Sequence, residues 1–582
     1  MDPQLGATTN ANRIYFISAC TLKYKCVLDQ ISSILSQNSS LSETKCFNII
    51  IVPKVIATYD SMLENRGLYD IVQLHSFSWE FVYLDDQLLS LELPFLYKQL
   101  FVEKNHSLLS SISMSLWSLF HVTGKPKCVL SLGKLSASVL DILEVYNESY
   151  ERDFVNHQSQ DIAALIVIDR DQDYASSLLT PATYSGLLCE IFDISCGHLE
   201  INKETKMKSG KLNFVNTETK SSKPKTTAMM LDSSIDNLYG EIKHRHFSEV
   251  LSVLSSKAKL LKNEDIKALG IQEMKQFVAT KLQQITLYKQ NLVNHVLASE
   301  TIISEMDNKF ENLTLNEIEM LNNRNKKSNF TFVDENFGTD IHIYNSLRLM
   351  CLLSLTQGLS YEEYNSLVNK YLLAFGYKFL YVFNNLVTAG LLVQPSSPKL
   401  SLTNLGTLSD RLPKWQNEFQ TVANKLKQLP SKSDDGKSPS YVFNGGYVPL
   451  VAVLCNALLT SDTFIEVLTK LSALNDLRVG GSIVDNLKNG IETLNEKLSN
   501  LNMQNDLDFG SKDGKSLLKI LKNDSKLSSI SLNPRTVLVY VIGGITYAEI
   551  AACNVVQTAT NSKIIIASDN IACGSDLMAA NT

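Results

Sequence analysis

Residues 165–173 read LIVIDRDQD, and residues 537–550 read VLVYVIGGITYAEI. In each stretch an apolar run ends at carboxylates or at a glycine turn and passes into a new segment, which is the pattern of a buried strand in a parallel α/β sheet. The two stretches lie far apart in the sequence, and another apolar run follows at 563–567. We therefore predict that these stretches are strands of one sheet.

The long segment between these strands has helical spacing and almost no strand signal. In its central block, residues 271–306, apolar residues such as Met274, Phe277 and Val278 recur at steps of three and four, which is the spacing of an amphipathic helix. The sequence therefore predicts an α/β protein into which an all-α domain is inserted.

The length of 582 residues exceeds what one hydrophobic core supports, so several domains are expected. We predict a small α/β domain over 1–100 and a helical domain over 233–437. A second α/β domain is expected to be discontinuous and to consist of residues 101–232 and 438–582. The return to α/β character follows a linker-like segment rich in serine and lysine.

The composition excludes several classes of function. The net charge of −6 gives no general attraction to nucleic acid, so nucleic-acid binding is not expected. The ten cysteines are scattered without CxxC pairs, which is typical of thiols in a reducing compartment. The start of the chain, MDPQ, lacks a secretory signal, and no apolar run has the ~18 residues of a membrane-spanning helix. We expect a cytoplasmic protein that contacts membranes through partners.

One pattern indicates an enzyme. Asp169 and Asp171 follow the first buried strand at positions i and i+2, where both carboxylates reach a Mg²⁺ ion, with Asp169 as the nucleophile. This is the opening pattern of haloacid-dehalogenase-like phosphohydrolases, and Ser568 offers the hydroxyl that they need. No convincing Gly-Asp…Asp partner follows Ser568. The alternative is structural: the carboxylates cap the next helix and pair with Arg170.

Other signatures of catalysis or cofactor binding are absent from the sequence. The pair Gly543 and Gly544 lacks the third glycine of GxGxxG, and neither GxxxxGK[ST] nor HExxH occurs. We therefore predict no cofactor, no metal site, no catalytic residue and no small-molecule substrate.

An ordered set of motifs resembles the Sec1/Munc18 family of SNARE regulators, and within it the vacuolar protein sorting-associated protein 33 branch. The motifs are 88–94 (LLSLELP), 168–173 (IDRDQD), 184–187 (YSGL), 345–354 (NSLRLMCLLS), 383–386 (FNNL), 389–392 (AGLL), 441–443 (YVF), 447–450 (YVPL) and 543–550 (GGITYAEI). The segments that resemble the B form of the branch more closely are 196–197 (CG), 246–250 (HFSEV), 256–258 (SKA), 274–278 (MKQFV) and 348–354 (RLMCLLS). By comparison with the family, the chain begins at the third strand of the first domain, which implies a truncated N-terminus.

The resemblance implies a three-domain arch with parallel α/β sheets in domains 1 and 2 and a helical domain 3. It implies a non-enzymatic protein that binds syntaxin-like SNAREs on late endosomes and lysosomes. It also implies a tethering partner, either a vacuolar protein sorting 16-type subunit or its homologue in the B branch. SNARE motifs assemble as a parallel coiled coil, so a groove that holds two of them in register would be a template for assembly.

The amphipathic block 271–306 is our candidate for the SNARE-facing surface. Lys275, Lys281, Lys289 and His295 are expected on its wetter side, where they would meet acidic partners. The alternative is that the apolar face of this block belongs to the domain core.

A second candidate site lies on an amphipathic helix expected at 414–428. Its residues Trp415, Phe419 and Val422 form an aromatic and aliphatic face that would anchor the tethering subunit. The alternative is again core packing. If this face anchors the tethering subunit, a charge at Phe419 would abolish partner binding and leave the fold intact.

Overall fold

The computed structural model describes residues 13–37, 47–52, 55–77, 81–149, 162–201, 227–263, 282–306, 309–339, 343–395, 419–430, 438–474, 476–480, 507–508 and 536–582. None of the helices in these ranges combines the length and the apolar character that a membrane span requires.

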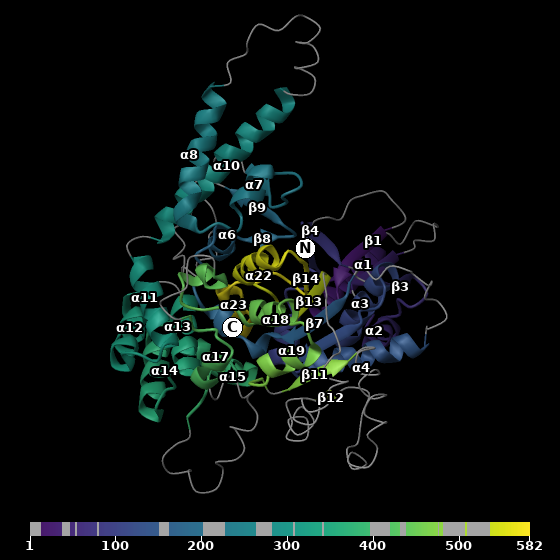
Figure 1. The fold of residues 1–582 in the computed structure, drawn as a ribbon. Coiled ribbons are helices and arrows are strands. Elements are labelled where there is room, and N and C mark those ends of the chain that lie inside the picture. The colour runs from purple at the N-terminus through teal and green to yellow at the C-terminus, as the bar shows by residue number, and fades with distance from the viewer. Residues whose placement is uncertain are drawn as a thin grey trace, which may run out of the picture.

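Among the described residues, the largest sheet has eight strands in the order β12-β11-β6-β7-β13-β14-β5-β4 (Figure 1). Their bounds are β4 Val82–Asp85, β5 Leu88–Ser90, β6 Cys128–Leu132, β7 Ala164–Asp169, β11 Leu477–Gly480, β12 Leu507–Asp508, β13 Thr536–Ile542 and β14 Lys563–Ser568. Neighbouring strands from β6 to β5 are parallel, whereas β4, β11 and β12 are each antiparallel to a neighbour.

Strands β7 and β13 lie side by side at the centre of this sheet. They are parallel, with Leu165 opposite Leu538 and Ile168 opposite Val541. Every residue of β7 is buried, as expected for a parallel strand that is covered on both faces. The prediction that these two distant apolar stretches belong to one sheet is confirmed.

Helices of the same part of the chain pack on this sheet. Their bounds are η1 Lys98–Val102, α3 Leu109–Thr123, α4 Lys134–Ser149, η3 Arg170–Gln172, α5 Ala175–Leu178, α6 Tyr184–Ile191, η7 Pro439–Phe443, α18 Leu450–Leu459, α19 Phe464–Lys470, α22 Tyr547–Thr560 and α23 Gly574–Asn581. Helix α4 packs on β6 and β7, and α22 packs on β14 and α18. Strand β13, helix α22 and strand β14 therefore form a strand–helix–strand unit, as the pattern of the sequence predicted.

A second, smaller parallel sheet lies near the N-terminus, in purple in Figure 1. In the described ranges it consists of three strands in the order β1-β2-β3 and is accompanied by two helices that share its own hydrophobic core. The bounds are β1 Arg13–Ser18, α1 Thr21–Gln37, β2 Phe47–Val52, α2 Thr58–Asn65 and β3 Val72–Ser76.

The boundary that we predicted at residue 100 does not separate the two parallel sheets. Strands β4 and β5 fall within the predicted first domain, yet β5 pairs with β14 and β4 pairs with β5. The reason is that short apolar runs near a domain boundary carry no signal of the sheet that they will join. The large sheet thus takes its edge strands from both sides of the predicted boundary.

Most of the residues that the structure describes between β7 and β13 are helical, as predicted. Helices α11 to α17 form a bundle beside the sheet (Figure 1) and share one continuous hydrophobic core with it. The bounds are α11 Lys309–Leu321, α12 Lys326–Thr339, α13 Ile343–Thr356, α14 Tyr361–Phe375, η5 Tyr377–Phe379, α15 Leu380–Ala389 and α17 Phe419–Lys425.

A separate part consists of a small antiparallel sheet and three helices. Its bounds are β8 Ile194–Ser195, β9 His198–Ile201, β10 Thr227–Met230, α7 Asn237–Ile242, α8 Phe247–Asn263 and α10 Leu282–Met306. Helices α8 and α10 pack together and project away from the rest of the molecule (Figure 1). We call this pair the α8–α10 hairpin.

Candidate functional site: a projecting helical hairpin

The inner face of the α8–α10 hairpin forms a small hydrophobic core with α6 and α7. On α10 this face includes Leu292, Ala298 and Ile302, and on α8 it includes Val250 and Leu254; all five are buried. The named residues are six and four positions apart on α10 and four apart on α8, so each helix turns one side toward the other elements. This core fixes the hairpin on the body.

The outer face of α10 carries a second apolar stripe that nothing in the described chain covers. It consists of Val293, Val296, Leu297 and Ile303, with exposed fractions between 38% and 56%. Their spacing of three, one and six residues puts all four on one side of the helix. We call these four residues the α10 stripe. Exposed aliphatic side chains gathered on one side of a projecting helix, here with the exposed Glu300 between Leu297 and Ile303, are typical of a protein interaction surface.

A buried polar network holds the base of α10. His295 is fully buried, and its Nδ1 lies 2.8 Å from the hydroxyl of Tyr184 on α6. Its Nε2 lies 3.0 Å from Oδ2 of Asp236, which also accepts hydrogen bonds from the first turn of α7. Burial acts to raise the pKa of Asp236. The hydrogen bond and charge interaction with His295 and the hydrogen bonds from the backbone N–H groups of Tyr239 and Leu238 together outweigh burial, so the pKa is lowered.

The prediction for His295 is therefore wrong, because this side chain lies in the core and not on the wetter side of the helix. Lys289 is exposed on α10, on the same side as the α10 stripe. Lys275 and Lys281 lie outside the described residues. Sequence analysis missed the α10 stripe because α10 has apolar residues on two faces, and spacing alone does not show which face is buried.

The carboxylate of Asp169 has a structural role, because it forms hydrogen bonds within the fold. Both oxygens of Asp169 accept hydrogen bonds of 2.7 Å from the backbone N–H groups of Leu135 and Ser136 in the first turn of α4. A side chain at Gly133 would collide with this carboxylate, so the glycine permits its close approach. Asp169 thus caps the helix that precedes its own strand.

The neighbouring residues of this motif join distant parts of the chain. Arg170 forms a fully buried ion pair with Glu549 on α22, with a distance of 2.8 Å between Nη1 and Oε2. Asp173 accepts hydrogen bonds from the hydroxyl of Tyr447, at 3.0 Å, and from the backbone N–H of Leu450, at 2.8 Å. The side chains of Asp169, Arg170 and Asp173 are thus engaged in contacts within the fold. The phosphohydrolase hypothesis with Asp169 and Asp171 is not supported.

The predicted anchor for a tethering subunit also lies in the core. Phe419 and Val422 on α17 are 4% and 1% exposed and belong to the hydrophobic core shared by the bundle and the large sheet. Trp415 lies outside the described residues. An amphipathic pattern shows that one face of a helix is apolar, but does not show whether the same chain covers that face. Neither residue is an exposed anchor.

The helical bundle has a different exposed apolar surface. Leu373 near the end of α14, Tyr377 in η5, and Leu380 and Tyr381 at the start of α15 are 53% to 74% exposed. We call these four residues the α14–α15 patch. Aromatic side chains are enriched at protein interfaces, so this patch is a better candidate for a partner than α17. The turn between α14 and α15 gave no periodic signal in the sequence.

These observations define a class of protein. The α/β body uses the carboxylates that follow β7 for hydrogen bonds and an ion pair within the fold. This body carries a projecting hairpin and a helical bundle, and each of them exposes an apolar surface. Such a molecule is a scaffold for protein partners. The Sec1 family profile matches residues 2–580, and the chain belongs to the Sec1 family. Because members of this family act as regulators, the protein is not an enzyme.

Relatives agree with the branch that the motifs indicated. The chain is 26% identical to vacuolar protein sorting-associated protein 33B of Danio rerio over 561 residues, which cover 92% of this chain and 82% of that protein. It is 25% identical to vacuolar protein sorting-associated protein 33A of Rattus norvegicus over 446 residues, which cover 74% of this chain and 70% of that protein.

The fold is also similar to that of a solved structure, the Unc18–syntaxin 1 complex from Monosiga brevicollis. The TM-score is 0.55 at 14% sequence identity, over 98% of this chain and 87% of that chain. The predicted Sec1/Munc18-like fold is therefore confirmed.

Proposed function

We propose that the protein is a SNARE-binding regulator of vesicle docking and fusion in protein transport to endosomes and lysosomes. Two facts support this proposal. The chain belongs to the Sec1 family and is similar to vacuolar protein sorting proteins, and its fold resembles that of an Unc18 protein solved with syntaxin 1.

The observation that carries the proposal is the α10 stripe. A SNARE motif is an amphipathic helix with apolar residues at heptad spacing, and such a helix needs a complementary row of apolar side chains on its partner. Val293, Val296 and Leu297 offer this row on a helix that projects into solvent (Figure 1). Lys289 lies on the same side and offers a positive charge to an acidic helix.

The hairpin is well suited to act as a template. Its inner face is fixed by an apolar core and by the network around His295, so the outer face is preorganised before a partner binds. Holding a SNARE helix against a rigid surface lowers the entropic cost of bringing a second helix into register.

We assign the tethering subunit to the α14–α15 patch. The expected partner is a vacuolar protein sorting 16-type subunit or its homologue in the B branch. The patch lies on the helical bundle, well away from the hairpin in Figure 1, so both partners can bind at once. A peripheral position on late endosomes or lysosomes would then follow from these partners, because the described chain has no helix suited to span a membrane.

Affinity purification of the tagged full-length chain from cytosol, followed by mass spectrometry, tests this function. Recovery of endosomal SNAREs together with a tethering subunit is the expected result. Recovery of SNAREs without a tethering subunit would remove the tethering role, and recovery of neither would contradict the proposal.

A further inference from the structure

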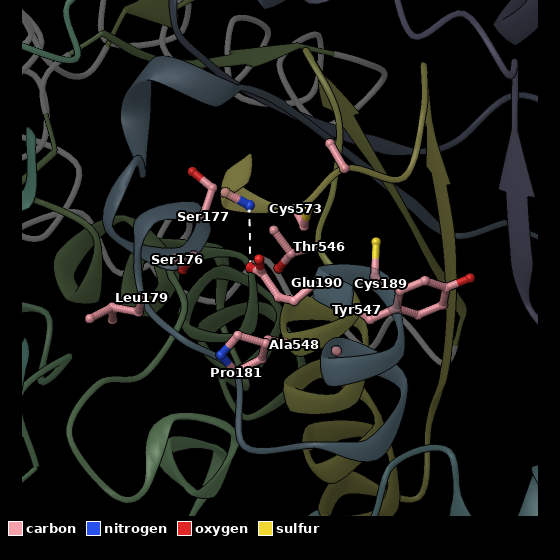
Figure 2. Close-up of a pocket in the computed structure, with 13 residues that line it drawn as sticks. Ser176, Ser177, Leu179, Pro181, Cys189, Glu190, Thr546, Tyr547, Ala548 and Cys573 are labelled. Carbon is pink, nitrogen blue, oxygen red and sulfur yellow. Dashed lines mark hydrogen bonds between the residues drawn. The ribbon is translucent and has the colours of Figure 1, made fainter. Parts of the chain in front are cut away.

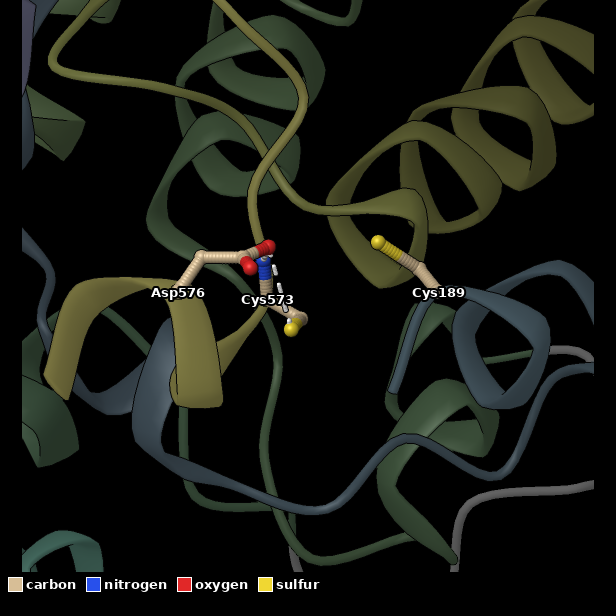
Figure 3. A group of neighbouring side chains, drawn as sticks. All are labelled: Cys189, Cys573 and Asp576. Atoms are coloured by element: carbon tan, nitrogen blue, oxygen red, sulfur yellow. Dashed lines mark hydrogen bonds between the residues drawn. The ribbon is translucent and has the colours of Figure 1, made fainter. Parts of the chain in front are cut away.

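Three side chains suited to metal binding meet where α6 approaches the C-terminal helix α23. The sulfur atoms of Cys189 and Cys573 and a carboxylate oxygen of Asp576 all lie within 4.8 Å of one another (Figure 3). Both cysteines are buried and Asp576 is half-buried. The sequence predicted no metal site because Cys189 is far in sequence from Cys573 and Asp576, and the fold alone brings it beside them.

The end of α23 already orients two of the three donor atoms. Cys573 is the N-cap residue of this helix, and Asp576 lies in its first turn. Oδ2 of Asp576 accepts hydrogen bonds from the backbone N–H of Cys573, at 3.0 Å, and from its thiol, at 3.2 Å. The thiol thus points its proton at the carboxylate, and a metal ion would displace that proton to solvent. The N-terminal end of a helix also favours negative charge.

A small cavity adjoins the group. It has a volume of about 10 Å³ and is lined by Cys189, Cys573 and Glu190, among others (Figure 2). This is close to the space that one water-sized sphere occupies. The cavity therefore has room for about one water molecule beside Cys189 and Cys573, and not for an organic ligand.

Contacts around the three side chains join α6, which carries Cys189, to the start of α23, which carries Cys573 and Asp576. Glu190, next to Cys189 on α6, lies 3.4 Å from the backbone N of Gly574 and 3.4 Å from Oγ of Ser575 on α23. It also pairs with Arg348 at 3.1 Å. A Cβ atom at Gly574 would lie 2.6 Å from Cδ of Arg348, so the close approach of the helix end requires glycine there. These contacts hold α6 and the start of α23 at a fixed separation.

We propose that Cys189, Cys573 and Asp576 bind a zinc ion, with water in the fourth position. Thiolate ligands select soft or borderline ions over Mg²⁺ and Ca²⁺, which prefer oxygen, and zinc accepts sulfur and carboxylate ligands in a tetrahedral site. Binding displaces the protons of the two thiols, which pass to solvent. The ion would join α23 to α6, the helix whose Tyr184 holds the base of the hairpin.

The test is the metal content of the purified full-length chain after equilibration with zinc chloride in the presence of a reducing agent. Inductively coupled plasma mass spectrometry should find about one zinc ion per chain. Cys189→Ser, Cys573→Ser and Asp576→Asn should each lower the zinc content and weaken binding at least about tenfold. Cys128→Ser, which changes a buried cysteine on β6, should have no effect.

A second readout uses cobalt in place of zinc in the wild-type chain, so it does not depend on whether a variant folds. Cobalt held by thiolates gives a strong charge-transfer absorption, which should appear in the wild type and in Cys128→Ser. A wild-type chain that takes up neither zinc nor cobalt would overturn the proposal. A disulfide between Cys189 and Cys573, found by peptide mapping without reduction, would overturn it too, as would zinc that all three variants retain.

Discussion

Arg170 and Glu549 form a bidentate ion pair in the centre of the molecule, although 379 positions separate them in the sequence. The two hydrogen bonds measure 2.8 and 2.9 Å, and the side chains are 1% and 0% exposed. Arg170 follows strand β7 and Glu549 lies in the first turn of α22. This contact therefore joins the two halves of the large sheet, which the helical insertion separates in the sequence.

Removing one partner of this ion pair should destabilise the protein strongly. We expect Glu549→Gln to lower the free energy of unfolding by about 3–5 kcal/mol, because it leaves the guanidinium of Arg170 buried without its counter-charge. Urea denaturation followed by circular dichroism measures this change. Glu249→Gln is the matched control, since Glu249 forms an exposed pair with Arg245 and its loss should be barely measurable.

Charges at Phe419 and at Tyr377 should have opposite consequences. Phe419→Asp places a charge in the core, and we expect a loss of at least about 3 kcal/mol of stability. Tyr377→Asp changes an exposed residue of the α14–α15 patch, so the melting temperature should stay the same while binding of the tethering subunit falls. Thermal melts and pull-downs of both variants test this. A folded Phe419→Asp variant that has lost the partner would return the tethering surface to α17.

The network around His295 should determine how firmly α10 is held. His295→Phe keeps the bulk of the ring but leaves Asp236 and the hydroxyl of Tyr184 without this partner, at a cost of about 1–3 kcal/mol. We expect faster amide hydrogen exchange in α10, measured by mass spectrometry.

The control for this measurement is His75→Phe, which changes an exposed histidine on β3 and should leave exchange in α10 unchanged. If exchange in α10 were equally slow in His295→Phe and in the wild type, apolar packing alone would hold the hairpin.

Asp569, at the end of β14, should make stability depend on pH. Burial raises its pKa from 3.8 to about 7. The folded state therefore holds this proton more tightly than the unfolded state, so the contribution of Asp569 is fully present below pH 4 and is lost as the pH rises to about 7. The total loss is on the order of 4 kcal/mol.

The measurement is the free energy of unfolding of the wild type and of Asp569→Asn between pH 4 and 8. The variant cannot titrate at this position, so the difference in stability between the two proteins should shift in favour of the variant as the pH rises. A difference that is independent of pH would show that Asp569 is already ionised in the folded protein at pH 4.

The sequence predicted the central strands because their signal is local. An apolar run that ends at Asp169, and another that ends at Gly543, each carry the full pattern of a buried parallel strand, and the structure pairs the two runs in register. The inserted helical region was predicted for the same reason, since its period is visible over many turns.

The sites could not be predicted in the same way, because exposure is a property of the whole fold. Val296 and Ile302 are both aliphatic residues of α10, yet the first is exposed and the second is buried. Phe419 looked like an anchor because the strands and helices that cover it lie elsewhere in the sequence. Cys189 and Cys573 approach each other only in the folded chain, because they are far apart in the sequence.

The most direct test of the central claim is the affinity of the purified full-length chain for a syntaxin-type SNARE motif, measured by fluorescence anisotropy with wild type and Leu297→Asp. The control is Val122→Asp, which changes another exposed aliphatic residue, on α3. We predict that Leu297→Asp weakens binding at least about tenfold, or about 1.4 kcal/mol, with an unchanged melting temperature, and that Val122→Asp binds as the wild type does. Equal affinity of all three proteins would contradict the assignment of SNARE binding to the α10 stripe.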